Sequence, residues 1–112
     1  MALATVLDVN VNGKVSDEPK NITTELTVTI EVINQEIKQA EGMAKVVGIF
    51  EYDGGSKENL EKFSRINAAA ILFPIVREYF LSMSAKAGLR PILLQPVNFV
   101  EMARRAEQKI ES

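Results

Sequence analysis

A two-residue alternation across residues 22–32 is the strongest constraint that this sequence places on its fold. Every odd position in the segment is Thr or Glu, and every even position except Thr24 is apolar. Successive side chains of a β-strand point to opposite faces, so the pattern predicts a strand with one buried and one solvated face. We therefore expect a sheet whose core lies on one side.

Two further strands are predicted beside this one. Residues 3–11 repeat the alternation, and residues 37–52 form a longer extended stretch. Residues 12–13 (Asn-Gly) are a candidate turn, residues 16–21 have the composition of a loop, and residues 34–35 are a plausible second turn. Short links between consecutive strands predict an antiparallel meander.

The third predicted strand is apolar on both faces near its end. Met43, Val47 and Ile49 share one parity, and the other parity is also mainly apolar. Such a strand is usually covered on both sides, so we expect cover on both faces. Gly42 and Gly48 would permit a close backbone approach or a bulge.

The second half of the chain has helical spacing. Ser56 can cap a short helix to about Phe63, and Asn67 can cap a longer helix that ends near Ala87, before Gly88. Residues 89–97 predict an extended crossover that contains two prolines, and a final helix follows it.

The longer helix is broadly apolar and contains Pro74, so it either starts just before this residue or kinks there. One face of a three-stranded sheet cannot bury so wide an apolar arc. The first stripe consists of Leu72, Val76, Phe80, Met83 and Ala87, and the second of Ile71, Ile75 and Tyr79. In the final helix, Asn98 is the predicted N-cap and Glu101 lies three residues later, as in a capping box.

These patterns predict one α+β domain of residues 1–112, with a three-stranded antiparallel meander followed by two main helices on one face. Composition excludes most catalytic chemistry. The chain has no Cys and no His, which removes the thiol nucleophile, the usual base for a Ser nucleophile and the common zinc ligands. A formal charge of -2 argues against general nucleic-acid binding. We expect no enzymatic activity, no cofactor and no metal.

Two interpretations of the remaining features stay open. Strand carboxylates such as Glu25 and Glu41 would allow a small carboxylate-using enzyme, although a solvated sheet face is the commoner role of exposed Glu. The apolar surplus in the third strand, the long helix and residues 92–94 is more informative. It indicates a subunit interface, a groove for apolar stretches of other chains, or both.

Two motifs carry a family resemblance. Residues 70–78 read A-I-L-F-P-I-V-R-E, and residues 94–99 read L-Q-P-V-N-F. At this spacing the pair closely resembles the SecB export chaperones, and residues 48–50 (Gly-Ile-Phe) fit the same family. The resemblance extends over residues 22–110.

The resemblance implies an ATP-independent holdase that binds unfolded secretory preproteins and passes them to a SecA-like motor. It also implies a homo-oligomer, either a dimer or a tetramer, with clients in a hydrophobic groove under the crossover. Residues 73–87 would pack between subunits. The implied groove residues are Phe50, Tyr52, Ile92, Leu94 and Phe99, and the implied interface residues are Leu72, Val76, Phe80 and Met83.

The chain also departs from the family pattern. Family members normally have four strands, and this chain corresponds to a start at the second, which predicts an exposed sheet edge. It lacks the acidic C-terminal tail of many members. Among positions that dock the motor in the family, only Asp8 and Glu41 are acidic candidates, and Met43 occupies a position that is often acidic.

We expect a cytoplasmic protein that does not insert into membranes. The first residues lack the basic flank of a signal peptide, and the longest apolar run, residues 68–76, is too short to span a bilayer. The alternatives to an export chaperone are a SecB-like oligomerisation module without export activity and a chaperone that serves a toxin–antitoxin system.

Overall fold

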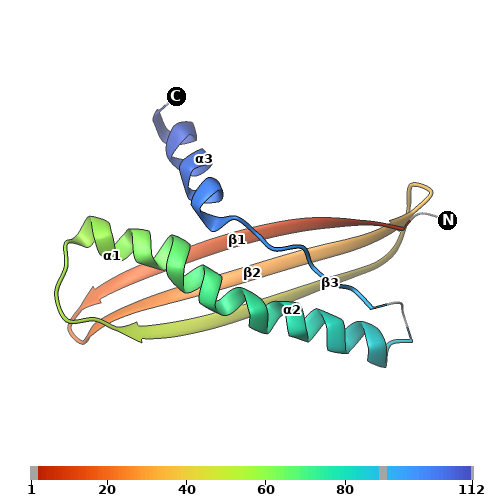
Figure 1. The fold of residues 1–112 in the computed structure, drawn as a ribbon, viewed down its shortest axis with the longest axis horizontal. Coiled ribbons are helices and arrows are strands. Elements are labelled where there is room, and N and C mark those ends of the chain that lie inside the picture. The colour runs from red at the N-terminus through yellow and green to blue at the C-terminus, as the bar shows by residue number, and fades with distance from the viewer. Residues whose placement is uncertain (1–2, 89–90, 112) are drawn as a thin grey trace.

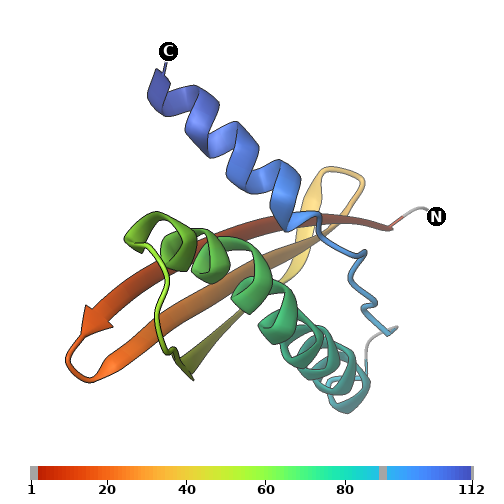
Figure 2. The same ribbon diagram turned by 60° about the vertical axis from the view of Figure 1, so that its left-hand side comes forward.

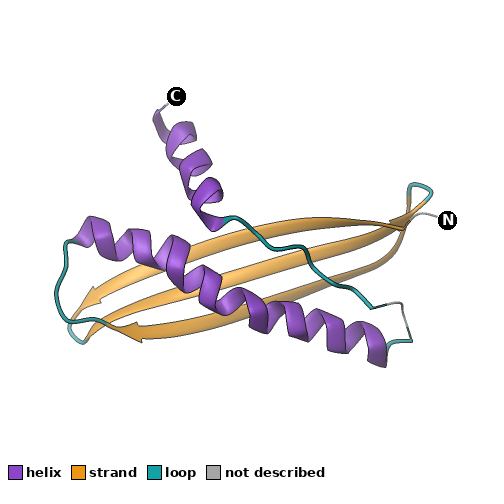
Figure 3. Ribbon diagram, viewed as in Figure 1, coloured by secondary structure: helices purple, strands orange, loops and turns teal. Residues whose placement is uncertain are grey.

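The computed structural model describes residues 3–88 and 91–111. Three antiparallel strands form one sheet in sequence order, and the helices lie on one of its faces (Figure 1; Figure 3). The predicted α+β meander is confirmed. The strands are β1 (Leu3–Asp17), β2 (Lys20–Asn34) and β3 (Ile37–Glu51). The helical segments are α1 (Lys57–Phe63), the π-helical η1 (Ser64–Ala68), α2 (Ala69–Lys86) and α3 (Phe99–Glu111).

The predicted turn at residues 12–13 is wrong, because β1 runs through it. The pairing of β1 with β2 is unbroken as far as Asp17 and Lys20, so the chain turns only at Glu18 and Pro19. The glycine of the predicted turn has a packing role instead: a Cβ atom on Gly13 would collide with the side chain of Ser64. Gly13 therefore lets the helical layer approach β1 closely.

The second turn lies one residue later than predicted. It is formed by Gln35 and Glu36, both of which have positive φ angles, of 52° and 66°. Two consecutive left-handed residues make the type I′ turn that joins strongly twisted antiparallel strands. Near this turn, the pairing of β2 with β3 has one irregularity, which lies between Val32 and Ile33.

The even-numbered side chains of β2 form the floor of the core. Ile22, Leu26 and Val28 are almost completely buried beneath the helices that cover this face of the sheet. Thr24, which breaks the apolar alternation, is also buried, and its hydroxyl hydrogen-bonds with that of Ser64 at 2.6 Å. A buried hydroxyl needs such a partner, so this pair explains the exception in the sequence pattern.

The opposite face of the sheet is uncovered, contrary to the prediction that β3 is covered on both sides. Met43, Val47 and Ile49 are 64%, 50% and 68% exposed. Figure 2 shows the helices on one face only, so the described part of the chain provides no second layer over the other face. Gly42 and Gly48 also differ from expectation, since each makes room for a side chain of α2 rather than for a backbone or a bulge.

The helix ends agree in part with the sequence. Ser56 caps α1 as predicted, since its Oγ accepts a hydrogen bond from the Asn59 amide at 3.1 Å. Asn67 is not a cap, because it lies within η1 and the chain is already helical there. Pro74 lies inside α2, and Gly88 follows this helix with a φ angle of 74°, as a C-terminal glycine does.

By length and composition alone, the helical stretch Lys57–Lys86 could cross a membrane, with a mean hydropathy of 1.3 in its most apolar window. The core helix of a soluble protein meets the same criterion. One side of α2 packs on the sheet through Leu72, Val76 and Phe80. We therefore interpret the apolar character as core packing plus an exposed apolar stripe.

Candidate functional site

An apolar pocket of about 190 Å³ lies between the C-terminal half of α2, the sheet and the crossover. Among the described residues that line it, Glu41 is the only charged one, so these residues provide no paired groups for acid–base chemistry. What it can do is accept apolar side chains from outside. Its apolar lining includes Ile30, Val32, Phe80, Met83, Ala87 and Ile92.

Ser84 ties the crossover to α2 beside this pocket. Its buried Oγ donates to the Leu81 carbonyl at 2.9 Å and accepts from the Ile92 amide at 3.0 Å. The second bond anchors a segment that has no regular secondary structure. Ser84 thus positions Ile92 in the pocket lining, a role that the sequence pattern did not reveal.

Replacing Ser84 by alanine should lower the free energy of unfolding by about 1–3 kcal/mol, because the part-buried Ile92 amide loses its acceptor. Denaturant unfolding measures the loss, and hydrogen exchange at the Ile92 amide should become faster. Ser82→Ala is the matched control, since Ser82 is half-buried and has no hydrogen bond to other described residues. Equal effects of the two substitutions would contradict the anchoring role.

The predicted groove residues do not form one groove in the single chain. Ile92 lies near Val32, whereas Phe50 pairs with Ile22, ten residues away along β2. At 3.3 Å per residue this is a separation of roughly 33 Å. Phe50 packs edge-on against the ring of Phe63, with centroids 5.6 Å apart, beneath α1.

Tyr52 lies at the same distant end of the sheet as Phe50. Its hydroxyl donates to the Ser16 carbonyl at 2.8 Å and lies 3.4 Å from an oxygen of Asp17. Removal from water disfavours the phenolate and, with the negative charge of Asp17 nearby, raises the pKa of Tyr52. These contacts give Tyr52 a structural role where the chain leaves β3.

Leu94 and Phe99 belong to the core of the single chain, and the prediction that they line a client groove stays a prediction. They are only 4% and 5% exposed. The Phe99 ring packs edge-on against Phe73, with centroids 5.9 Å apart. The motif that contains both residues therefore attaches α3 and the crossover to α2.

The predicted subunit interface also stays a prediction, and most of its residues are buried within the single chain. Leu72, Val76 and Phe80 are at most 5% exposed and pack against the chain's own sheet, which leaves them no surface for a partner. Met83 is 45% exposed. The apolar residues that α2 presents to solvent are the second stripe, Ile71, Ile75 and Tyr79, together with Met83. The wide apolar arc of this helix indicated that some apolar side chains would stay exposed. The helical spacing of those residues did not show which of the two stripes faces the sheet.

The two motor-docking candidates lie on the open face of the sheet. Asp8 is exposed, and its row across the sheet continues through Thr29 to Met43. Glu41 accepts a hydrogen bond from the Lys38 ammonium at 2.9 Å, which, together with the attraction of that charge, holds the pKa of Glu41 below its usual value. Among the described residues, the Asp8 carboxylate on β1 has no partner, whereas Glu41 on β3 is paired with Lys38.

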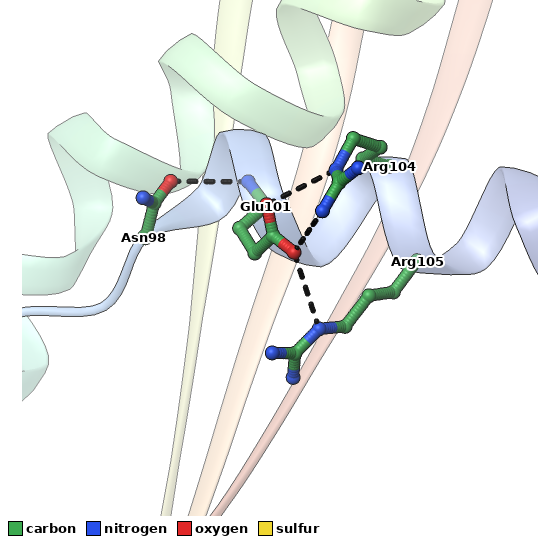
Figure 4. A network of polar contacts seen from close by, with 4 residues as sticks. All are labelled: Asn98, Glu101, Arg104 and Arg105. Carbon is green, nitrogen blue, oxygen red and sulfur yellow. Dashed lines mark hydrogen bonds and ion pairs between the residues drawn. The ribbon is translucent and has the colours of Figure 1, made fainter.

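The predicted cap of α3 is confirmed. The Asn98 side chain accepts a hydrogen bond from the Glu101 amide at 3.0 Å (Figure 4). The Glu101 carboxylate binds Arg104, at 2.6 Å from one guanidinium nitrogen, and lies 3.4 Å from Arg105. The Arg104 hydrogen bond lowers the pKa of Glu101. Because both arginines share a carboxylate, they form no free basic patch.

Comparison with known proteins identifies the family. The family model described as "Preprotein translocase subunit SecB" matches residues 3–110. The chain belongs to the SecB family. The SecB protein of Dechloromonas aromatica is 34% identical over 91% of this chain and 68% of its own length. The SecB protein of Nitrosococcus oceani is 31% identical over 92% of this chain and 62% of its own length.

Other matches are shorter or structural. The SecB protein of Afipia carboxidovorans is 36% identical over 58% of this chain, and the match spans 44% of that relative. The chain therefore spans about half to two thirds of the curated SecB proteins that it matches. The fold matches the SecB-like chaperone of Mycobacterium tuberculosis, solved with a ChAD peptide from the HigA1 antitoxin. That match has a TM-score of 0.77 at 17% identity and covers 86% of this chain and 73% of the other.

Proposed function

We propose that this SecB-family chain is a chaperone that binds unfolded, apolar segments of other proteins without using ATP. The observation that carries the proposal is the apolar pocket beside the crossover, with Tyr79 and Met83 partly exposed on its wall. The crossover residue Ile92 closes one side and is held there by Ser84. No chemical step is needed, since binding alone keeps a client from aggregating.

The pocket suits varied clients. Burying apolar surface contributes about 25 cal/mol per Å², whatever the sequence of the segment. Met43 and Met83 both belong to the pocket wall, and flexible, polarisable methionine side chains adapt to irregular shapes. This combination favours a promiscuous binder over a site for one ligand.

The finer proposal is that clients are secretory preproteins in the cytoplasm, held by a dimer or tetramer and delivered to a SecA-like motor. Family membership supports this assignment. The exposed α2 stripe of Ile71, Ile75 and Tyr79 supports assembly, because isolated chains rarely expose so much contiguous apolar surface. Asp8 is the stronger motor-docking candidate, since Glu41 is already paired with Lys38.

A second candidate function is a chaperone for an antitoxin. The observation that favours it is the structural match to a SecB-like chaperone that was solved with an antitoxin peptide. In both functions the client would bind to an apolar surface of this chain. The two functions differ in which protein is the client.

Aggregation of a chemically unfolded model protein tests the chaperone proposal. Light scattering of the diluted client should fall when this chain is added at stoichiometric amounts in the absence of ATP. A client that aggregates equally with and without the chain would contradict the proposal and leave only an assembly role. Competition between a preprotein segment and an antitoxin peptide then distinguishes the two client classes.

A further inference from the structure

Methionine is the only sulfur-containing residue type in this chain. The sequence has four Met and no Cys. A mild oxidant therefore finds no thiol to attack, and the thioether sulfur of methionine is its common remaining target. Met43, Met83 and Met102 lie in the described part of the chain. The effect of oxidation at each depends on where its side chain lies.

Met83 combines access to solvent with a position on the apolar pocket. It lies on the C-terminal half of α2, belongs to the lining of the pocket of about 190 Å³ and is 45% exposed. A small oxidant dissolved in water can therefore reach its side chain while the pocket is empty. A client segment that fills the pocket would cover the same side chain.

The other two described methionines are placed differently. Met43 also belongs to the pocket wall, but it pairs with Thr29, and its row across the sheet lies on the open face. Met102 lies on α3, is half-buried against the core and is not among the described residues that line the pocket. Of the three, Met83 is the one whose oxidation would change the helical wall of the pocket.

Oxidation of methionine by a peroxide is a two-electron reaction. The thioether sulfur attacks one oxygen of hydrogen peroxide, so an S–O bond forms and the O–O bond breaks. The sulfur is oxidised to the sulfoxide, and the second oxygen leaves as water with both hydrogen atoms. Methionine sulfoxide reductases reverse the change: two thiols become a disulfide, and the sulfoxide oxygen leaves as water.

A sulfoxide would fit poorly in a pocket covered by a client. It is a polar hydrogen-bond acceptor, whereas the thioether is apolar and flexible. Of the polar side chains in the described lining, the Glu41 carboxylate only accepts, and the Ser84 hydroxyl already donates to the Leu81 carbonyl at 2.9 Å. A client would therefore remove water from an acceptor that neither group can satisfy, which weakens binding.

We propose that Met83 is a reversible oxidation site, and that its conversion to the sulfoxide by a peroxide lowers the affinity of this chain for apolar clients. The inference rests on the proposed chaperone function and adds its regulation. The reduced chain binds apolar segments, and the oxidised chain binds them weakly. Because the chain has no thiol, this thioether couples client affinity to the oxidant.

Peroxide treatment followed by client titration tests the proposal. The full chain is oxidised with hydrogen peroxide, catalase removes the excess, and a labelled unfolded client without Met or Cys is titrated by fluorescence. Peptide mass spectrometry locates each sulfoxide. The oxidised chain should bind about tenfold more weakly, because a client then buries an unsatisfied acceptor. A methionine sulfoxide reductase with dithiothreitol should restore the affinity.

Substitutions assign the effect to one residue. Met83→Leu keeps the apolar volume and removes the sulfur, so it should bind clients normally and lose about twofold at most after peroxide treatment. Met43→Leu and Met102→Leu are the matched controls and should stay as sensitive as the wild-type chain. Met83→Gln, which adds a permanent polar amide, should bind weakly without any oxidant. Light scattering and circular dichroism check that all variants keep the same assembly and fold.

A bound client gives an independent readout, because it should slow sulfoxide formation at Met83 and leave Met102 unaffected. The proposal is overturned if Met83 is not oxidised, if a chain with the sulfoxide there keeps its affinity, or if Met83→Leu loses as much as the wild-type chain. If the reduced chain binds no client, the proposed chaperone function fails and this inference fails with it. If the reduced chain binds and oxidation changes nothing, only the inference fails.

Discussion

Replacing Phe99 by alanine should lower the free energy of unfolding by about 3–5 kcal/mol. Phe99 is 5% exposed, and its ring packs against Phe73, so truncation removes buried apolar surface and leaves a cavity beneath α3. This is a large fraction of the total stability of a small domain, which is about 5–15 kcal/mol. Denaturant unfolding of the full chain measures the loss.

Two further variants make this measurement decisive. Phe99→Leu keeps most of the apolar volume and should show a smaller loss, which can be measured even if the alanine variant unfolds. Val100→Ala, at the next position and 60% exposed in the wild-type chain, should change stability by no more than about 0.5 kcal/mol. If Phe99→Ala kept wild-type stability but lost client binding, Phe99 would line a groove, as the family resemblance implied.

Local sequence patterns predicted the sheet well because each face of a strand lies in a single environment, which is either the protein core or water. The alternation in β2 is buried at even positions and more exposed at odd ones, as expected for a sheet covered on one side. Ser56, Gly88 and Asn98 also have the predicted roles, because caps depend on neighbours within a few residues. Gly13 was misassigned to a turn because its function depends on Ser64, which is distant in the sequence.

The candidate site was harder to predict because it depends on which stripe of α2 faces the sheet. Both stripes have helical spacing, and only the packed fold shows that Leu72 and Val76 point inward while Ile71 and Ile75 point outward. The family resemblance located the crossover, but Leu94 within it serves the core. Ser84, which anchors the crossover, shows no signal in the sequence, since its acceptor role depends on a residue of another segment.

Replacing Met83 by aspartate should weaken client binding by at least about tenfold and leave the chain folded. Met83 lies on the wall of the apolar pocket and is 45% exposed, so the unbound chain keeps the new carboxylate solvated. A client segment that covers the pocket would have to remove water from this charge, which costs far more than the 1.4 kcal/mol that corresponds to a tenfold change. Fluorescence titration with a labelled unfolded client measures the affinity.

Leu93→Asp is the matched control, because Leu93 lies on the crossover, is 57% exposed and is not part of the pocket lining. It should change client affinity by about twofold at most. Met83→Leu, which conserves apolar volume, should retain binding. Since Met83 is also a candidate interface residue, light scattering must show the same assembly for all variants at the titration concentration. Under that condition, equal losses in Met83→Asp and Leu93→Asp would place the client elsewhere, because a charge outside the pocket would then matter as much as one inside it.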